Sequence, residues 1–209
     1  MFEWIGEHSN VLDVLLSAAM LVVWLGYLQA FLQGFRRERR PKILINRGGG
    51  GSLHAHCLLS NMSAEAIYIH SLVARLNSAD EETFAAVTDL VGGTDDVTKF
   101  TLKEATLQGP VAAGDFIDAG TFESILGRAG WHTPAAGTDE VANVEPVELE
   151  LVVVATYRSE DLIVGASRRF SIAAGDSGWT VNPSAVATQQ IRSKRQRKAL
   201  LKAYTDYLN

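Results

Sequence analysis

Cysteine is almost absent from this chain of 209 residues, because Cys57 is the only one. A single cysteine cannot form an intrachain disulfide, so the hydrophobic core alone must hold the fold together. The lack of cysteine pairs also fits a reducing compartment. Cys57 falls on the expected core face of a strand, where a thiol acts as a small apolar side chain rather than as a nucleophile.

Catalytic and phosphate-binding motifs are also missing. The sequence contains no GxSxG, HExxH or CxxC pattern. The glycine run at residues 48–51 is followed by neither Lys-Ser nor Lys-Thr, and a predicted strand rather than a helix comes next. We therefore expect no enzymatic activity and no cofactor.

The histidines offer the only metal-ligand pattern, and it is incomplete. His54 and His56 share one face of a predicted strand, because side chains alternate along a strand, and His70 could lie on an adjacent strand. A metal site needs three or four ligands, and no spacing in the sequence supplies the others. We interpret these histidines as surface residues and keep a metal-binding protein as an alternative.

Basic residues are scarce in the middle of the chain. Residues 48–190 contain seven Lys or Arg and 19 Asp or Glu, which gives this part a net charge of −12. Such a surface repels phosphate groups, so we exclude nucleic acid as its partner. The remaining 12 basic residues lie in two clusters, before and after this acidic part.

One long hydrophobic run occupies residues 11–34. Twenty-four residues at ~1.5 Å each span roughly 36 Å, enough to cross a ~30 Å hydrocarbon layer. Residues 1–10 contain no Lys or Arg, whereas RRERRPK follows the run. The positive-inside rule then predicts a single-pass protein of the cell (inner) membrane: a short external N-terminus (1–10), a transmembrane helix (11–35), a basic juxtamembrane segment (36–42) and a cytoplasmic remainder.

Two other interpretations of this run are less consistent with the charges. A cleaved signal peptide has its positive residues before the apolar run, not after it. A buried core helix of a soluble protein would leave the charge asymmetry unexplained.

Small side chains recur on one face of the predicted transmembrane helix. Small residues at four-residue spacing let two helix backbones approach closely, so this face predicts association with another membrane helix, from a second copy or from a different protein. The positions are Ala18, Val22, Gly26, Ala30 and Gly34.

Short alternating or β-branched segments, separated by turn residues, follow the basic segment. Seven to nine strands at this spacing predict an all-β domain over residues 43–185, an antiparallel β-sandwich with an immunoglobulin-like layout. A β-barrel is the alternative. Within the domain, residues 121–128 (TFESILGR) predict a short helix capped by Thr121, and residues 129–145 a surface loop. The expected strands cover 42–46, 53–60, 66–76, 83–90, 97–107, 111–118, 147–157, 162–172 and 179–181.

The C-terminal residues 186–209 predict a basic amphipathic helix. Such a helix binds anionic lipid or an acidic protein surface, or else covers one edge of the sandwich. We predict a membrane-surface role for the basic residues of both clusters: Arg36, Arg37, Arg39, Arg40, Lys42, Arg192, Lys194, Arg195, Arg197 and Lys198.

These features together predict an accessory, regulatory or scaffolding subunit anchored in the membrane. Its helix would bind an integral membrane protein complex or a second copy, and its cytoplasmic sandwich would bind other proteins. A homo-oligomeric pore or transport subunit is the alternative, with Asp13, Gln29 and Gln33 facing water.

Overall fold

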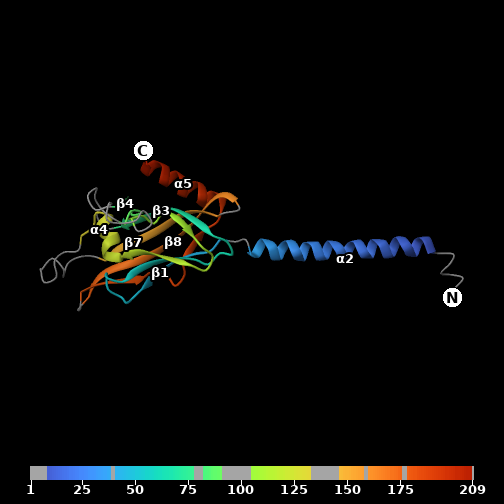
Figure 1. Cartoon of the computed structure of the whole chain (residues 1–209), viewed down its shortest axis with the longest axis horizontal. Helices are drawn as coiled ribbons and strands as arrows, with labels where there is room; N and C mark the ends of the chain where they lie inside the picture. Colours follow the sequence, from blue (N-terminus) through green and yellow to red (C-terminus); the bar gives the residue numbers. More distant parts are fainter. Residues whose placement is uncertain are drawn as a thin grey trace. The chain divides into compact units, whose positions relative to one another are not determined.

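The computed structural model describes residues 9–38, 41–77, 82–90, 105–132, 146–157, 160–175 and 178–208. The chain divides into two units, Met1–Arg40 and Pro41–Asn209, drawn in Figure 1. The first is helical. The second, which we call the β domain, consists mostly of antiparallel sheet with a C-terminal helix.

Helix α2 (Ser9–Glu38) makes up the described part of the first unit. Its segment Asn10–Gly34 has a mean hydropathy of 2.1, and none of it is buried within the chain. Leu, Val and Ala without a proline keep the helix continuous until shortly before Pro41. The predicted apolar helix is thus confirmed, and it is long enough to cross a membrane.

A three-stranded antiparallel sheet forms one layer of the β domain. It contains β1 (Ile43–Gly48), β2 (His56–Asn61) and β6 (Phe116–Thr121), in the order β1-β2-β6. Strand β2 begins later than predicted, because residues 52–55 turn and the Ala55 amide donates to the Ser52 carbonyl at 3.0 Å. The predicted alternation still holds: Leu53, Ala55, Cys57 and Leu59 are all buried.

The second sheet has seven strands and is also antiparallel. Its main order is β10-β8-β7-β3-β4, with β5 paired to β3 and β9 paired to β8. Strand β7 occupies the predicted residues. The strand predicted at 111–118 is wrong, because a turn at residues 112–115 separates β5 from β6. Much of the strand predicted at 97–107 and of the loop predicted at 129–145 lies outside the described residues. The strands are β3 (Ile67–Asn77), β4 (Glu82–Ala86), β5 (Gly109–Val111), β7 (Val147–Tyr157), β8 (Glu160–Gly175), β9 (Gly178–Pro183) and β10 (Gln189–Ile191).

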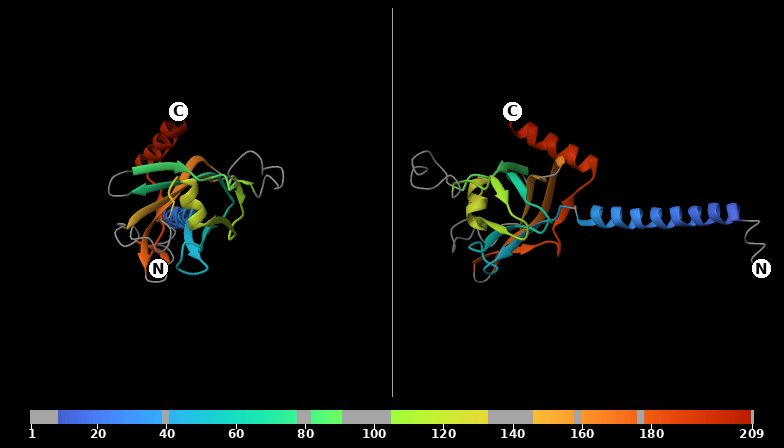
Figure 2. Two further views of the ribbon diagram at one scale, coloured as in Figure 1. Left: turned by 90° about the vertical axis from the view of Figure 1, so that its left-hand side faces the viewer. Right: turned by 45° about the vertical axis from the view of Figure 1, so that its right-hand side comes forward.

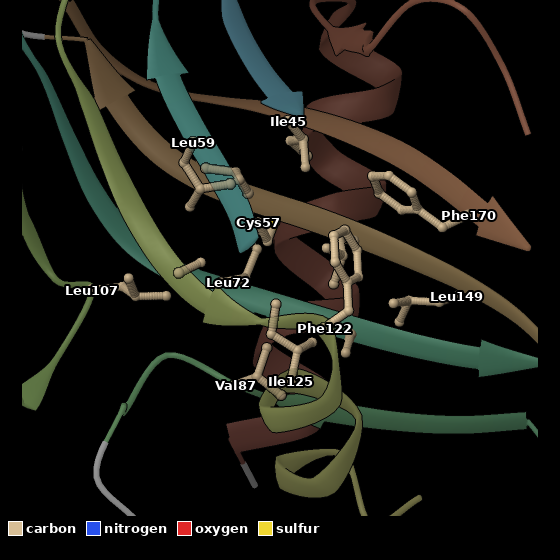
Figure 3. Packing of buried hydrophobic residues seen from close by; sticks show 14 of the residues in the cluster. Ile45, Cys57, Leu59, Leu72, Val87, Leu107, Phe122, Ile125, Leu149 and Phe170 are labelled. Atoms are coloured by element: carbon tan, nitrogen blue, oxygen red, sulfur yellow. The ribbon is translucent and has the colours of Figure 1, made fainter. Parts of the chain in front are cut away.

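One hydrophobic core joins the two sheets. Ile45 and Leu59 from the first sheet pack in the same cluster as Leu149 and Phe170 from the second. Phe122 meets Phe170 edge to face, with ring centroids 4.8 Å apart (Figure 3). Each fully buried side chain of this size contributes about 1.5–3 kcal/mol, so the core suffices without a disulfide.

The gap between β1 and β10 is closed by side chains rather than by backbone pairing. The Ile43 amide donates to Gln190 Oε1 at 3.0 Å, and Gln190 Nε2 donates back to the Ile43 carbonyl. The Ile45 amide donates to Thr188 Oγ1 at 3.0 Å, and Arg168 donates to the Ile45 carbonyl at 2.6 Å. The side-chain amide of Gln190 thus satisfies the outer edge of β1 as a neighbouring strand would.

Helix α5 (Lys194–Leu208) forms as predicted but starts later than residue 186. Residues 189–191 instead pair with β8 as strand β10. A capping box starts the helix: Ser193 Oγ accepts from the Gln196 amide at 3.1 Å, and Gln196 Oε1 accepts from the Ser193 amide at 3.2 Å. Leu200 packs on the outer face of the larger sheet, against Val152 and Val154.

Candidate functional site

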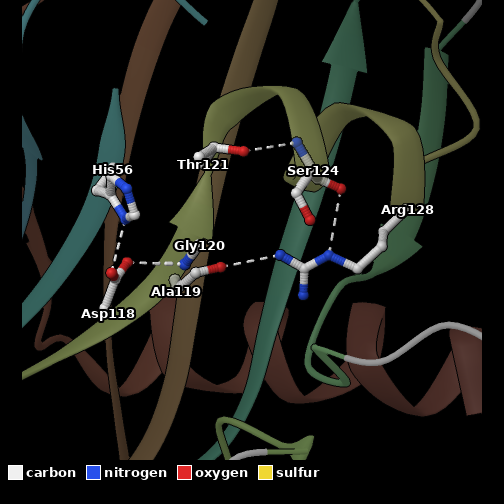
Figure 4. A network of polar contacts seen from close by, with 7 residues as sticks. All are labelled: His56, Asp118, Ala119, Gly120, Thr121, Ser124 and Arg128. Carbon is white, nitrogen blue, oxygen red and sulfur yellow. Dashed lines mark hydrogen bonds and ion pairs between the residues drawn. The ribbon is translucent and has the colours of Figure 1, made fainter. Parts of the chain in front are cut away.

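Helix α4 (Phe122–Arg128) lies at one end of the core. Thr121 caps it as predicted, with its Oγ1 accepting from the Ser124 amide at 3.1 Å. Phe122, Ile125 and Leu126 are buried, so one face of this short helix belongs to the core. The opposite, polar side carries the contacts drawn in Figure 4.

Arg128 joins α4 to β6 and to the segment after β4. Its guanidinium donates to the carbonyls of Val87 (2.7 Å) and Asp89 (2.9 Å). It also donates to the carbonyls of Ala119 (2.9 Å) and Ser124 (3.2 Å), the two bonds drawn in Figure 4. Burial lowers the pKa of this side chain from its usual value. A guanidinium used in this way is a structural clamp.

His54, in the turn before β2, and His56, at the start of β2, each meet a carboxylate. His56 Nδ1 lies 2.6 Å from Asp118 Oδ2, and Asp118 Oδ1 accepts from the Gly120 amide at 2.9 Å (Figure 4). His54 Nδ1 lies 3.0 Å from Glu123 Oε2. The His54 and His56 side chains are 79% and 51% exposed, which confirms them as surface residues.

His70 is not on a strand adjacent to the other two histidines, and that prediction is wrong. It lies on β3 of the larger sheet, where its Nε2 is 3.2 Å from Thr156 Oγ1. Within the described ranges, no three His, Cys, Asp or Glu side chains gather as a set of metal ligands. The surface thus carries two imidazole–carboxylate pairs, His54 with Glu123 of α4 and His56 of β2 with Asp118 of β6.

A cavity of about 620 Å³ opens on the side of the β domain away from the β1–β10 closure. Strand β6, at the edge of its sheet, borders it through Ile117 and Asp118, and β5 borders it from the other sheet. We call this cavity the open-side groove. Apolar side chains and an edge strand together suit an extended peptide better than a small polar ligand. Its lining comprises Leu90, Thr106, Leu107, Gln108, Gly109, Pro110, Val111, Ile117 and Asp118.

A second cavity, of about 440 Å³, lies beside Arg168 and Arg169. Arg168 is occupied by backbone carbonyls, including that of Ile45. Arg169 lies 3.9 Å from Glu148 and 3.8 Å from Glu150. Both cations are thus already engaged, and this cavity is a poor site for an anion.

The small face of α2 is exposed along its length. All five predicted positions are exposed, and a Cβ placed on Gly26 or Gly34 would meet nothing within 4 Å.

The structure brings part of the two basic clusters together. Arg192 Nη2 donates to the Pro41 carbonyl at 3.3 Å, and Lys42 is exposed next to it in the chain. Arg39 and Arg40 lie outside the described residues, and Arg36 and Arg37 belong to the last turn of α2. Lys194, Arg195 and Lys198 are exposed on α5, and Arg197 is half-buried.

The roles of Arg128, Gln190 and the Ser193 cap were not predicted from the sequence. The Ser-x-x-Gln pattern at residues 193–196 is a recognisable helix start and could have placed α5 correctly. Arg128 and Gln190 gave no such signal, because their partners are backbone carbonyls and amides far away in the sequence.

Comparison with known proteins yields no match to a family model, to a curated protein or to a solved structure.

Proposed function

We propose that this chain is a single-pass membrane-anchored accessory or scaffolding subunit whose β domain binds another protein in the open-side groove. The observation that carries the proposal is the groove itself, an apolar cavity of about 620 Å³ bordered by edge strand β6. An extended peptide can place apolar side chains against Leu107 and Ile117 and pair its backbone with β6. The role is binding rather than catalysis.

We also infer that the β domain is a sandwich with an immunoglobulin-like layout. The strand order supports this. The order β1-β2-β6 corresponds to strands A, B and E of such a sandwich, and β3-β7-β8 corresponds to C, F and G. Strand β4 then takes the place of an additional strand next to C. In immunoglobulin-like domains, loops and sheet edges commonly serve as binding surfaces, which agrees with a groove beside β6.

The anchor gives the subunit a second binding surface. Helix α2 would cross the cell membrane with residues 1–10 outside and the β domain in the cytoplasm, because the arginines follow the apolar segment. The exposed face with Gly26, Ala30 and Gly34 would pack against a helix of a membrane protein complex or of a second copy.

Site-specific photo-crosslinking in intact cells tests binding in the groove. A photoreactive amino acid is placed at Gln108, in the groove lining, or at Asn182, an exposed control position on β9. We expect a discrete protein adduct from position 108 only, and its loss when Pro110→Trp narrows the groove. Equal adducts from both positions, or an adduct that persists in the Pro110→Trp variant, would refute binding in the groove.

A further inference from the structure

The two ends of the β domain's chain are fixed side by side. Strand β1 directly follows the juxtamembrane segment, and β10 directly precedes α5. The bonds from Gln190 and Thr188 to Ile43 and Ile45 hold these two strands together. Arg192 then bonds to Pro41, 151 residues away in the sequence. Basic residues from both clusters therefore meet at one end of the domain.

Helix α5 lies outside the two sheets of the β domain, as Figure 2 shows. It is attached there by Leu200, which is only 8% exposed. Gly165 on β8 permits this close contact, since a Cβ at that position would lie 2.9 Å from Leu200 Cδ2. The side of α5 that carries Leu200 therefore faces the sheet, and helix geometry gives the residues on the opposite, outward side.

Four cations occupy the outward side of α5. At about 100° per residue, Lys194, Arg195, Lys198 and Lys202 fall within an arc of about 100° that is centred nearly opposite Leu200. All four are exposed. Residues 192–202 contain no acidic side chain. In the part of the chain that the structure describes, none of the four forms an ion pair or a side-chain hydrogen bond, so their charge is available to an external partner.

The anchor keeps this charge close to lipid. The candidate span ends at Gly34, and α2 continues to Glu38. Four helical residues and three further chain steps cover at most about 17 Å, so chain length alone keeps Pro41 within that distance of the hydrocarbon edge. The headgroup region takes up about 5–8 Å of it, and the remainder is close to the Debye length of about 8 Å.

We propose that Lys42, Arg192 and the outward face of α5 (Lys194, Arg195, Lys198 and Lys202) form one docking surface for anionic lipid headgroups. The inference rests on the membrane anchoring in the proposed function and not on binding in the groove. Lipid is the occupant because the tether holds it within reach of the cations, and each cation near an anionic leaflet adds to the attraction. The β domain would then be held with its residue-41 end towards the bilayer.

A fluorescence experiment on the full-length chain tests the docking surface. Cys57→Ala removes the only native thiol, and Leu201→Cys places a dye on α5 at a position that is 45% exposed. The labelled chain is assembled into nanodiscs of phosphatidylcholine, with or without phosphatidylglycerol, that carry a headgroup quencher. We expect strong quenching only with phosphatidylglycerol, and its loss in about 1 M salt, where the Debye length is about 3 Å.

Charge variants complete the test. Changing Arg192, Lys194, Arg195 and Lys198 together to Gln should lower the docked fraction by at least about tenfold in the anionic nanodiscs. The control exchanges Lys194→Arg, Arg195→Lys and Lys198→Arg, which keep the charge and should keep the quenching.

Equal quenching in both lipid compositions overturns the proposal, and so does quenching that survives the Gln changes. If α5 bound an acidic protein surface instead of lipid, the quenching of the dye would not depend on phosphatidylglycerol, and the proposal would be wrong. A chain that fails to enter nanodiscs at all would refute the anchor, which is a distinguishable result.

Discussion

Backbone carbonyls hold two arginines of the β domain, Arg128 and Arg168. Arg128 donates to four carbonyls, and Arg168 donates to those of Ile45, Ala185 and Val186. Burial lowers the pKa of both side chains, and several of their bonds to carbonyls are themselves partly buried. In such surroundings a carbonyl without its donor is costly, so these side chains are strong determinants of stability.

Replacing Arg128 with Met keeps much of the side chain's length but removes every donor. We expect a loss of about 2–4 kcal/mol in the free energy of unfolding, because several carbonyls lose their partner. Denaturant unfolding of the full-length chain measures it. Arg169→Met is the matched control: its ion pairs with Glu148 and Glu150 are 3.8–3.9 Å long and its side chain is 57% exposed, so it should cost under about 1 kcal/mol. Equal losses for the two variants would contradict the clamp.

Cys57 should be inert in the folded protein. Burial, and secondarily the charge of Asp118, raises the pKa of its thiol to about 12. We therefore expect no reaction with Ellman's reagent at pH 8 until denaturant is added. Rapid modification under native conditions would show that this part of the core is open.

The same pKa shift makes stability depend on alkaline pH. The unfolded thiol ionises near pH 8.5, so its contribution is fully present below that pH and is lost as pH rises towards about 12. Between pH 7 and pH 10 the wild type should lose about 2 kcal/mol more stability than the Cys57→Ala variant. Parallel pH profiles for the two proteins would contradict this expectation.

Closure between the two sheets depends on one strand of three residues. Gln190 of β10 and Thr188, the residue just before β10, bond to the edge of β1. Without this cover, β1 would expose unpaired amides and carbonyls, which pair readily with another strand.

Gln190→Leu should therefore have two effects. The Ile43 amide and carbonyl lose their partners, at a cost of about 1–3 kcal/mol in the free energy of unfolding, and the freed edge should promote association that grows with protein concentration. Unfolding and light scattering measure the two effects. The neighbouring Gln189 is exposed, so Gln189→Leu serves as the control. If both variants behave alike, Gln190 is not what closes the edge.

Local patterns predicted the elements better than they predicted the contacts between them. The alternation in residues 147–157 predicted the bounds of β7, and Thr121 as a capping residue predicted the start of α4. On the outer face of β7, Val152 and Val154 are buried because Leu200 of a distant helix covers them, and no local pattern indicates that contact. The acid partner of His54 comes from α4 and that of His56 from β6. Both lie more than 60 residues away in the sequence, so no local spacing could have indicated them.

The proposed association through α2 would depend on the small residues along one face of that helix. Gly26→Leu and Ala30→Leu together should greatly reduce crosslinked dimer or complex, because the added side chains hold the two backbones apart. Ser17→Leu is the control: at about 100° per residue, Ser17 lies nearly opposite Gly26, so the same kind of enlargement there should have little effect. Crosslinking in detergent extracts compares the variants. Loss in all of them, or in none, would show that this face is not the contact.

At the scale of the whole molecule, the chain consists of an apolar helix followed by a β domain with a groove. The helix predicts attachment to a membrane, and the arginines after it predict on which side the β domain lies. Groove binding, helix association and lipid docking would all operate on that side or within the bilayer. The location of the β domain is therefore the central claim.

Fusions at residue 209 test this claim most directly. The chain is expressed in a bacterium with green fluorescent protein, which fluoresces after folding in the cytoplasm, or with alkaline phosphatase, which becomes active only outside it. We predict fluorescence that stays with the membrane fraction after alkaline washing, together with an inactive phosphatase. An active phosphatase with a dark fluorescent protein would place the β domain outside the cytoplasm, and fluorescence in the soluble fraction would show that α2 is not a membrane anchor.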